Sequence, residues 1–319
     1  MNKAEAKRAL ESFLDGLPPE ARRETKKAIR EHIYLKSPTV WALEELELDL
    51  DPWQQQLVNT APYAIKNRPR NFSRILALTH RQAGKSTGAS VALAHQAKYG
   101  PPGSDSIVLA PTARQSSEVI RRTKQLLLKA GARLLTDNTH SLEVATSGLP
   151  SRVIGYPGSD PSAIRGASVS GILCADECAF FPNNDETLLT ALPFLFRHKE
   201  TSRLIACTTP SPTKSGWFYT QWTEGSDDDY LKISAHVKDC RHLSEADLER
   251  ERRSMPESVY LREFCLQWGG DDVRLFSDRA LAAFSEPVYP AMPSQDDDPD
   301  NIVVATRPLF PIKQEGMRF

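Results

Sequence analysis

Two short groups of residues have the types and the spacing that phosphate chemistry requires. The first, Thr79-His-Arg-Gln-Ala-Gly-Lys-Ser-Thr87, lies between an apolar run that begins at Ile75 and a run of small, helix-forming residues. In a loop of this kind the backbone N–H groups and the start of the helix face phosphates, Lys85 reaches the β and γ oxygens, and Ser86 offers a hydroxyl to Mg²⁺. The loop therefore predicts a nucleoside-triphosphate site, although Thr79 stands where the usual pattern has glycine.

The second group, Ile172-Leu-Cys-Ala-Asp-Glu177, reads as a buried strand that ends in two acids. That arrangement places Asp176 in the Mg²⁺ shell and Glu177 beside an attacking water molecule. A strand, a loop, a helix and then a strand with paired carboxylates together predict hydrolysis of the triphosphate, with Glu177 as the catalytic carboxylate.

The elements that must position these groups follow a regular alternation. Apolar runs near 75–79, 106–110, 169–175 and 203–208 predict strands, and helical stretches near 86–98, 114–129 and 184–196 separate them. This alternation predicts an α/β fold with a mostly parallel sheet and helices on both faces. Shorter β-like runs at 142–145 and 152–156 indicate an inserted hairpin or added antiparallel strands, and 230–265 indicates one strand and two helices.

The two ends of the chain differ from this middle part. Residues 1–50 predict an N-terminal helical appendage, and Leu10, Phe13 and Leu14 form part of its first apolar stripe. Its basic pairs at 22–23 and 26–27 could touch a phosphate backbone, but interspersed glutamates favour a solvated helix face. Residues 51–270 form the expected nucleotide-binding domain, and 271–319 a loosely structured tail rich in Pro and Asp.

The composition restricts the class of protein, but it does not identify a binding partner. Lys and Arg number 40 against 41 Asp and Glu, so the net charge of -1 gives no overall basic excess, and any contact with nucleic acid must come from local patches. The five cysteines are odd in number and scattered, which favours reduced thiols inside a cell over disulfides. Cys174 and Cys178 could be imagined as metal ligands, but no second pair follows them. The chain has no apolar run long enough to span a bilayer, which predicts a soluble cytoplasmic protein with no membrane partner.

Four further motifs accompany the loop and the acidic strand in a fixed order. They are Leu50-Asp-Pro-Trp-Gln-Gln-Gln-Leu57, Val108-Leu-Ala-Pro-Thr-Ala-Arg-Gln-Ser-Ser-Glu118, Ser162-Ala-Ile-Arg-Gly-Ala-Ser168 and Ile205-Ala-Cys-Thr-Thr-Pro-Ser211. Together with the loop, whose leading glycine is replaced by a polar residue, they resemble the ATPase domain of the large terminase subunit. That subunit is the motor that packages double-stranded DNA into tailed-phage and herpesvirus capsids. The resemblance covers about residues 50–270.

The resemblance implies a P-loop NTPase fold of RecA/ASCE type and a set of site residues. The residues implied to bind ATP are Gln54, Thr79, Arg81, Gln82, Ala83, Gly84, Lys85, Ser86, Thr87, Thr208 and Thr209, with Ser86 and Asp176 as the Mg²⁺ ligands. Arg81 would sense or stabilise the γ-phosphate, although an arginine in a solvent-exposed loop is the alternative. Gln54 would recognise adenine through its amide, whereas the alternative is a plain helix start with Trp53 in the core.

Two motifs carry roles that involve movement or a second subunit. In some members of the family the arginine that matches Arg165 reaches into the neighbouring subunit as an arginine finger, so Arg165 is a candidate catalytic residue. A structural role at the sheet edge is the alternative. Thr208 and Thr209 resemble the family's coupling motif, which could relay hydrolysis to DNA movement, or they are a strand followed by a proline turn.

The resemblance further implies an ATP-hydrolysing motor subunit of a phage or prophage that moves double-stranded DNA into a procapsid in the host cell cytoplasm. Its partners would be further copies in a homo-oligomeric ring, a portal protein and a small terminase subunit. A nuclease domain is not expected, because the acids after residue 270 lie in one polar stretch. Cleavage would then come from a separate nuclease polypeptide, or the chain is a fragment.

Two rival functions and three DNA-contact candidates stay open. The rivals are a helicase-like DNA-dependent ATPase and a non-catalytic remnant that binds DNA or portal. The basic clusters at 66–70, 121–124 and 250–253 are candidates for DNA contact, and each is also explained as a solvated surface.

Overall fold

An eight-stranded sheet organises the part of the chain that the structure describes. The computed structural model describes residues 3–60, 73–182, 185–241 and 243–269. The strand order is β3-β4-β5-β2-β6-β7-β1-β8. The strands are β1 (Arg74–Thr79), β2 (Asp105–Ala110), β3 (Leu134–Asp137), β4 (Ser141–Val144), β5 (Ser151–Pro157), β6 (Ile172–Asp176), β7 (Arg203–Thr208) and β8 (Leu231–Ala235). All pairings from β5 to β8 are parallel, which confirms the mostly parallel α/β sheet.

The region between β2 and β6 contains both parallel and antiparallel strands. β3 and β4 form an antiparallel pair, and β4 is antiparallel to β5. β5 itself pairs in parallel with β2, from Asp105 opposite Arg152 to Ala110 opposite Pro157. The β-like run at 152–156 therefore extends the main sheet, and β3 and β4 are its antiparallel addition.

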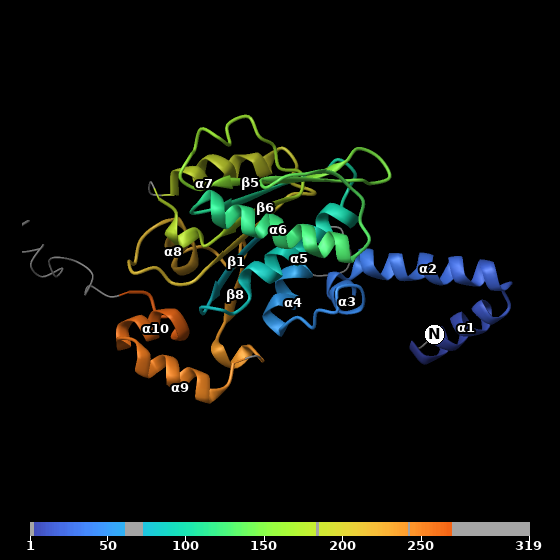
Figure 1. Cartoon of the computed structure of the whole chain (residues 1–319), viewed down its shortest axis with the longest axis horizontal. Helices are drawn as coiled ribbons and strands as arrows, with labels where there is room; N and C mark the ends of the chain where they lie inside the picture. Colours follow the sequence, from blue (N-terminus) through green and yellow to red (C-terminus); the bar gives the residue numbers. More distant parts are fainter. Residues whose placement is uncertain (1–2, 61–72, 183–184, 242, 270–319) are drawn as a thin grey trace, which may run out of the picture. The chain divides into compact units, whose positions relative to one another are not determined.

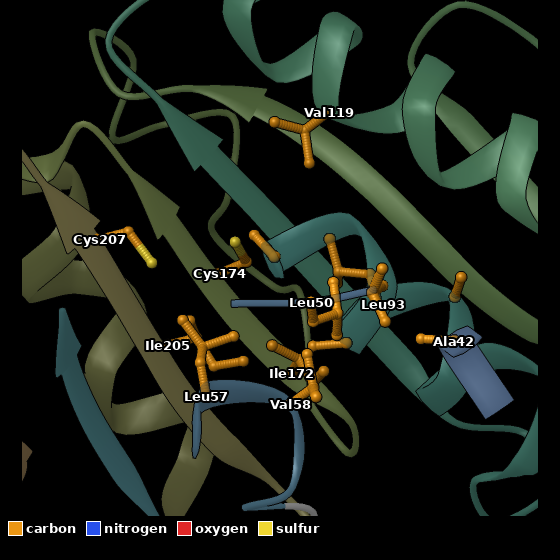
Figure 2. Close-up of a cluster of buried hydrophobic side chains, with 14 of the residues drawn as sticks. Ala42, Leu50, Leu57, Val58, Leu93, Val119, Ile172, Cys174, Ile205 and Cys207 are labelled. Carbon is orange, nitrogen blue, oxygen red and sulfur yellow. The ribbon is translucent and has the colours of Figure 1, made fainter. Parts of the chain in front are cut away.

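Helices cover both faces of the sheet because successive strand residues point to opposite sides. Ile75 and Ala77 pack with one buried cluster, and Leu76 and Leu78 with the other. The first face carries α3 (Pro38–Glu44), α4 (Pro52–Val58), α5 (Lys85–Tyr99) and α6 (Ala113–Lys129), with α5 and α6 side by side (Figure 1). The second carries α7 (Glu186–Ala191), the 3₁₀ helix η3 (Leu192–Phe196) and α8 (Trp217–Thr223). Figure 2 shows part of the first cluster, in which side chains of β6 and β7 meet side chains of α4 and α5: Ile172, Cys174, Ile205, Cys207, Leu57, Val58 and Leu93.

One helical prediction needs adjustment, and one helix was not predicted. The stretch expected as one helix near 184–196 is an α-helix that continues as a 3₁₀ helix at Leu192, where Pro193 lacks the N–H that an α-helical bond would use. The helix α8 was not among the expected elements. The strand and two helices expected over 230–265 are present as β8, α9 (Glu245–Ser254) and α10 (Glu257–Cys265).

The N-terminal segment is helical and joins the core through its later part. It comprises α1 (Lys3–Asp15), α2 (Pro19–Lys36) and α3. Of the first expected apolar stripe, Leu14 is buried, whereas Leu10 and Phe13 stay exposed. Trp41 is fully buried, and its ring lies 5.4 Å from that of His95 in α5. The predicted tail at 271–319 lies outside the described residues.

All five cysteines are free thiols, and four of them are buried. Burial raises the pKa of the Cys174 and Cys178 thiols well above their ordinary value, so both are poor metal ligands. Among the described helices, none is long and apolar enough to cross a membrane.

Candidate functional site

Three neighbouring strands bring the predicted chemistry together. β7 lies between β1 and β6, with Thr208 opposite Leu78 and Cys207 opposite Asp176. Because parallel strands end at the same edge of a sheet, the loop after β1, the acids that end β6 and the threonines that end β7 converge there.

The loop after β1 presents open backbone donors. Gly84 precedes α5 with a φ of 87°, a left-handed conformation that favours glycine, and an added Cβ would lie 2.6 Å from Nε2 of Gln54. The first helical bond runs from the Gly88 N–H to the Gly84 carbonyl (3.1 Å). The N–H groups of residues 85–87 therefore have no partner within the helix and can receive an anion.

Side chains of α5 and β6 meet directly at this opening. Lys85 is 7% exposed, and its Nζ lies 3.2 Å from Glu177 Oε1. The Ser86 hydroxyl donates to Asp176 Oδ2 (3.1 Å). Glu177 has a φ of 52°, a strained conformation for a residue with a side chain, and such strain concentrates at functional sites. Four of the predicted site residues thus lie within contact distance of one another.

Asp176 has the environment of a cation ligand. Its side chain is buried, and its Oδ1 has no hydrogen-bond partner. Burial, with the neighbouring Glu177 charge, raises the pKa of Asp176 from 3.8 to about 6, although Lys85 and Ser86 act in the opposite direction. An orphaned carboxylate oxygen beside a serine hydroxyl fits Mg²⁺, which keeps several waters and takes few protein ligands. Within the described ranges no group of three or more His, Cys, Asp or Glu side chains forms a separate metal cluster.

The raised pKa of Asp176 predicts a gain in stability on Asp176→Asn when Mg²⁺ is absent. Since the folded pKa lies above the unfolded one, the native state loses stability as pH rises from about 4 through about 6. At neutral pH the ionised carboxylate costs up to about 3 kcal/mol, which asparagine removes. We expect a higher thermal midpoint for the variant at neutral pH, a smaller difference near pH 5, and a smaller stabilisation by MgATP than in the wild type. A variant less stable than the wild type at both pH values would contradict this assignment.

The two threonines that follow one another at the end of β7 hydrogen-bond to the residues after β6. The Thr209 N–H and hydroxyl both lie near Glu177 Oε2, at 3.3 and 3.5 Å. The Thr208 hydroxyl accepts from the Ala179 N–H (3.3 Å) and donates to the Thr209 carbonyl (2.8 Å). A change in the position of Glu177 would therefore alter the hydrogen bonds of Thr209, at the start of the loop that follows β7.

Arg81 has a partner that the sequence did not reveal. Its N–H donates to the Glu263 carbonyl (2.6 Å), and its guanidinium lies 3.6 Å from the Glu263 carboxylate, which Arg262 also contacts. The Arg81 side chain is 66% exposed, so it is free to reorient toward a ligand. Glu263 is not among the site residues that the sequence predicted. Its contact with the loop depends on how α10 folds back, which no local pattern predicts.

A buried histidine within the same loop contacts the loop backbone. His80 Nδ1 lies 2.6 Å from the Arg81 carbonyl, which can only accept, so Nδ1 carries the proton. Nε2 of the same ring lies 3.0 Å from Cys240 Sγ. Thr79, the residue in place of the usual glycine, is buried at the end of β1 and donates to the His80 carbonyl (3.3 Å).

Gln54 contacts the loop itself. Its amide N–H donates to the Gly84 carbonyl (3.0 Å), and its Oε1 accepts from the Asp51 N–H (2.9 Å). Gln55, its neighbour, donates instead to the Leu50 carbonyl (2.8 Å). Trp53 is buried in the core, as the alternative to base recognition expected. In this structure the Gln54 amide holds the start of α5, and adenine recognition stays a prediction.

Arg165 lies apart from these residues. It is exposed and lines a hollow of about 360 Å³ with Asp105 and Arg152, which form an ion pair (2.6 Å). Within the described part of the chain, its side chain makes no hydrogen bond or ion pair with the loop or the acids. A contribution to this site would have to come from another copy.

Comparisons with known proteins agree on one family. A family model described as the terminase large subunit, T4likevirus-type, N-terminal, matches residues 76–282. Among solved structures, the chain is similar to the large terminase of a thermophilic bacteriophage in complex with ADP, with a TM-score of 0.58 and 18% identity over 69% of this chain and 53% of that one. The Thermus phage P74-26 large terminase ATPase domain has a TM-score of 0.53 and 20% identity over 67% of this chain and 96% of that one. The HK97 bacteriophage large terminase has a TM-score of 0.58 and 13% identity over 73% of this chain and 55% of that one. The chain thus spans about half the length of the ADP-bound terminase and of the HK97 protein, and at these identities the likeness shows the fold.

Proposed function

The chain belongs to the family of terminase large subunits, and from this premise we propose that it is an ATP-hydrolysing motor subunit that moves double-stranded DNA into a procapsid. The observation that supports this most directly is the meeting of Lys85 and Ser86 with Asp176 and Glu177 at the ends of adjacent strands. The large terminase of the thermophilic bacteriophage was solved with ADP, which supports a nucleotide in the same loop of this chain.

Each side chain has a role that its position supports. The N–H groups of residues 85–87 and the Lys85 ammonium would hold the triphosphate, and Ser86 with Asp176 would hold Mg²⁺. Bound Mg²⁺ would neutralise charge on the phosphate oxygens. Glu177, held by Thr209, would orient the attacking water and accept its proton. Because a triphosphate competes for Lys85, its arrival would weaken the Lys85–Glu177 pair and release the carboxylate for this task.

Arg81, Arg165 and the assembly complete the proposal. Arg81 would turn from Glu263 to the γ-phosphate, and Arg165 would enter the site of the next copy in a ring. The ATPase domain would comprise residues 51–270. Portal protein and a small terminase subunit would be its further partners.

Steady-state MgATP turnover across a range of protein concentrations, with and without double-stranded DNA, tests the proposal. We expect turnover to rise more steeply than linearly with concentration, because sites are completed between copies, and to increase with DNA. Tight MgATP binding without turnover under any condition would reject a self-sufficient ATPase and favour the non-catalytic reading.

A further inference from the structure

Helix α2 carries four basic side chains on one face. Arg23, Lys26, Lys27 and Arg30 are spaced i, i+3, i+4 and i+7, and all four are exposed. At 100° of rotation per residue they fall within an arc of about 100°. The glutamates at 20, 24 and 31 fall together at one flank of that arc. Residues that alternate in sign along the sequence are therefore separated on the helix surface into a basic stripe and an acidic flank.

The stripe borders a hollow that is itself basic. The hollow measures about 700 Å³ and lies between α2 and the C-terminal ends of α5 and α6, where Lys98 and Ala130 line it. Six basic side chains line it against two carboxylates, those of Glu31 and Glu45. Arg22 pairs with Asp15, and Lys98 donates to the Ala130 carbonyl (2.7 Å), so these two are already engaged.

The stripe differs from the other basic clusters in having no partner. Within the described residues, Arg23, Lys26, Lys27 and Arg30 make no ion pair or side-chain hydrogen bond. By contrast, Arg121 and Arg122 share Glu118, Arg250 pairs with Asp247, and Arg253 pairs with Glu249. The cluster at 66–70 lies outside the described residues. Among the described residues of these basic clusters, the α2 stripe is the cluster in which no basic side chain forms an ion pair.

We propose that the α2 stripe, defined by Arg23, Lys26, Lys27 and Arg30, binds the phosphate backbone of double-stranded DNA without regard to sequence. The inference rests on the proposed function, which makes DNA a partner. The stripe runs about 10 Å along the helix, and the rise of about 3.4 Å per nucleotide of one strand places about three phosphates along it. Four exposed basic side chains on one helix face, with no ion pair among the described residues, present a continuous positive surface, which is complementary to the uniform negative charge of a DNA backbone.

The test compares two quadruple variants with the same change in net charge. In one, Arg23, Lys26, Lys27 and Arg30 all become glutamine. In the other, the ion-paired Arg121, Arg122, Arg250 and Arg253 become glutamine. Fluorescence anisotropy with two duplexes of unrelated sequence, from about 50 to about 200 mM salt, gives affinity and its salt slope. We expect the stripe variant to bind both duplexes at least about tenfold more weakly, with a salt slope reduced by about 3, and the control to change the slope by less than about 1.

Other results would overturn the inference. Equal losses in the two variants would mean that the stripe contributes no more to DNA binding than the basic clusters at 121–124 and 250–253, and the stripe would not be the DNA site. Unchanged DNA binding by the stripe variant would also overturn the inference. An acidic protein surface would then be the partner that fits the stripe. MgATP turnover without DNA, measured on the same preparations, separates this failure from that of the proposed function. If the protein hydrolyses MgATP but the stripe does not bind DNA, only the inference about the stripe is rejected. If the stripe binds DNA but the protein does not hydrolyse MgATP, the ATPase proposal is rejected and the inference about the stripe stands.

Discussion

Replacing Glu177 with glutamine is expected to lower ATP turnover by about 10²- to 10⁴-fold while MgATP binding stays within a few-fold of wild type. The glutamine side chain keeps the size of glutamate and can still accept from the Thr209 N–H, but it cannot take a proton from water. The groups proposed to hold the nucleotide, Lys85 and the open N–H groups of residues 85–87, are unchanged. Turnover and calorimetric binding on the same preparation measure the two quantities.

A matched control makes this result specific to Glu177. Glu200→Gln removes the same charge from an exposed position and should leave turnover unchanged. If Glu177→Gln keeps wild-type turnover, another group activates the water, and the assignment of the acidic strand is wrong. If it loses binding as well, the Lys85–Glu177 pair is needed to form the site rather than to catalyse the reaction.

Replacing Arg165 with alanine is expected to lower turnover by about 10³- to 10⁵-fold at concentrations that support assembly, with nucleotide affinity unchanged. Arg165 is exposed and lies away from the loop of its own chain, so the loss would occur between copies. Mixing Arg165→Ala with Glu177→Gln should restore part of the activity. In a mixed ring, some interfaces then pair an intact Glu177 from the first variant with an intact Arg165 from the second.

The alternative role of Arg165 at the sheet edge predicts a different pattern. Arg152→Ala, in the same hollow, breaks the ion pair with Asp105 and serves as the structural control. A structural Arg165 would behave like it, with a lowered thermal midpoint and no recovery on mixing. Recovery on mixing with an unchanged midpoint is the result that the trans contact requires.

The sequence by itself determined the local parts of this protein. Unbroken apolar runs predicted β1, β2, β6 and β7, because a strand covered on both faces buries every side chain. The order of residues in the loop placed Lys85 and Ser86 at the start of α5, and the two acids at the end of β6 followed from the same reading. These features depend on neighbouring residues and on the period of each element, which a sequence displays directly.

Only the tertiary structure decided which distant segments meet. The placement of β7 between β1 and β6, the parallel pairing of β5, and the contact of Glu263 with Arg81 all depend on how the chain returns to the sheet. The same holds for the Gln54 amide, which lies against Gly84, and for the α2 stripe, whose lack of partners can be judged only once every nearby carboxylate has a position. Local preferences fix backbone conformation and burial, whereas contacts between segments depend on the packing of the whole sheet and its helices, so no short pattern encodes them.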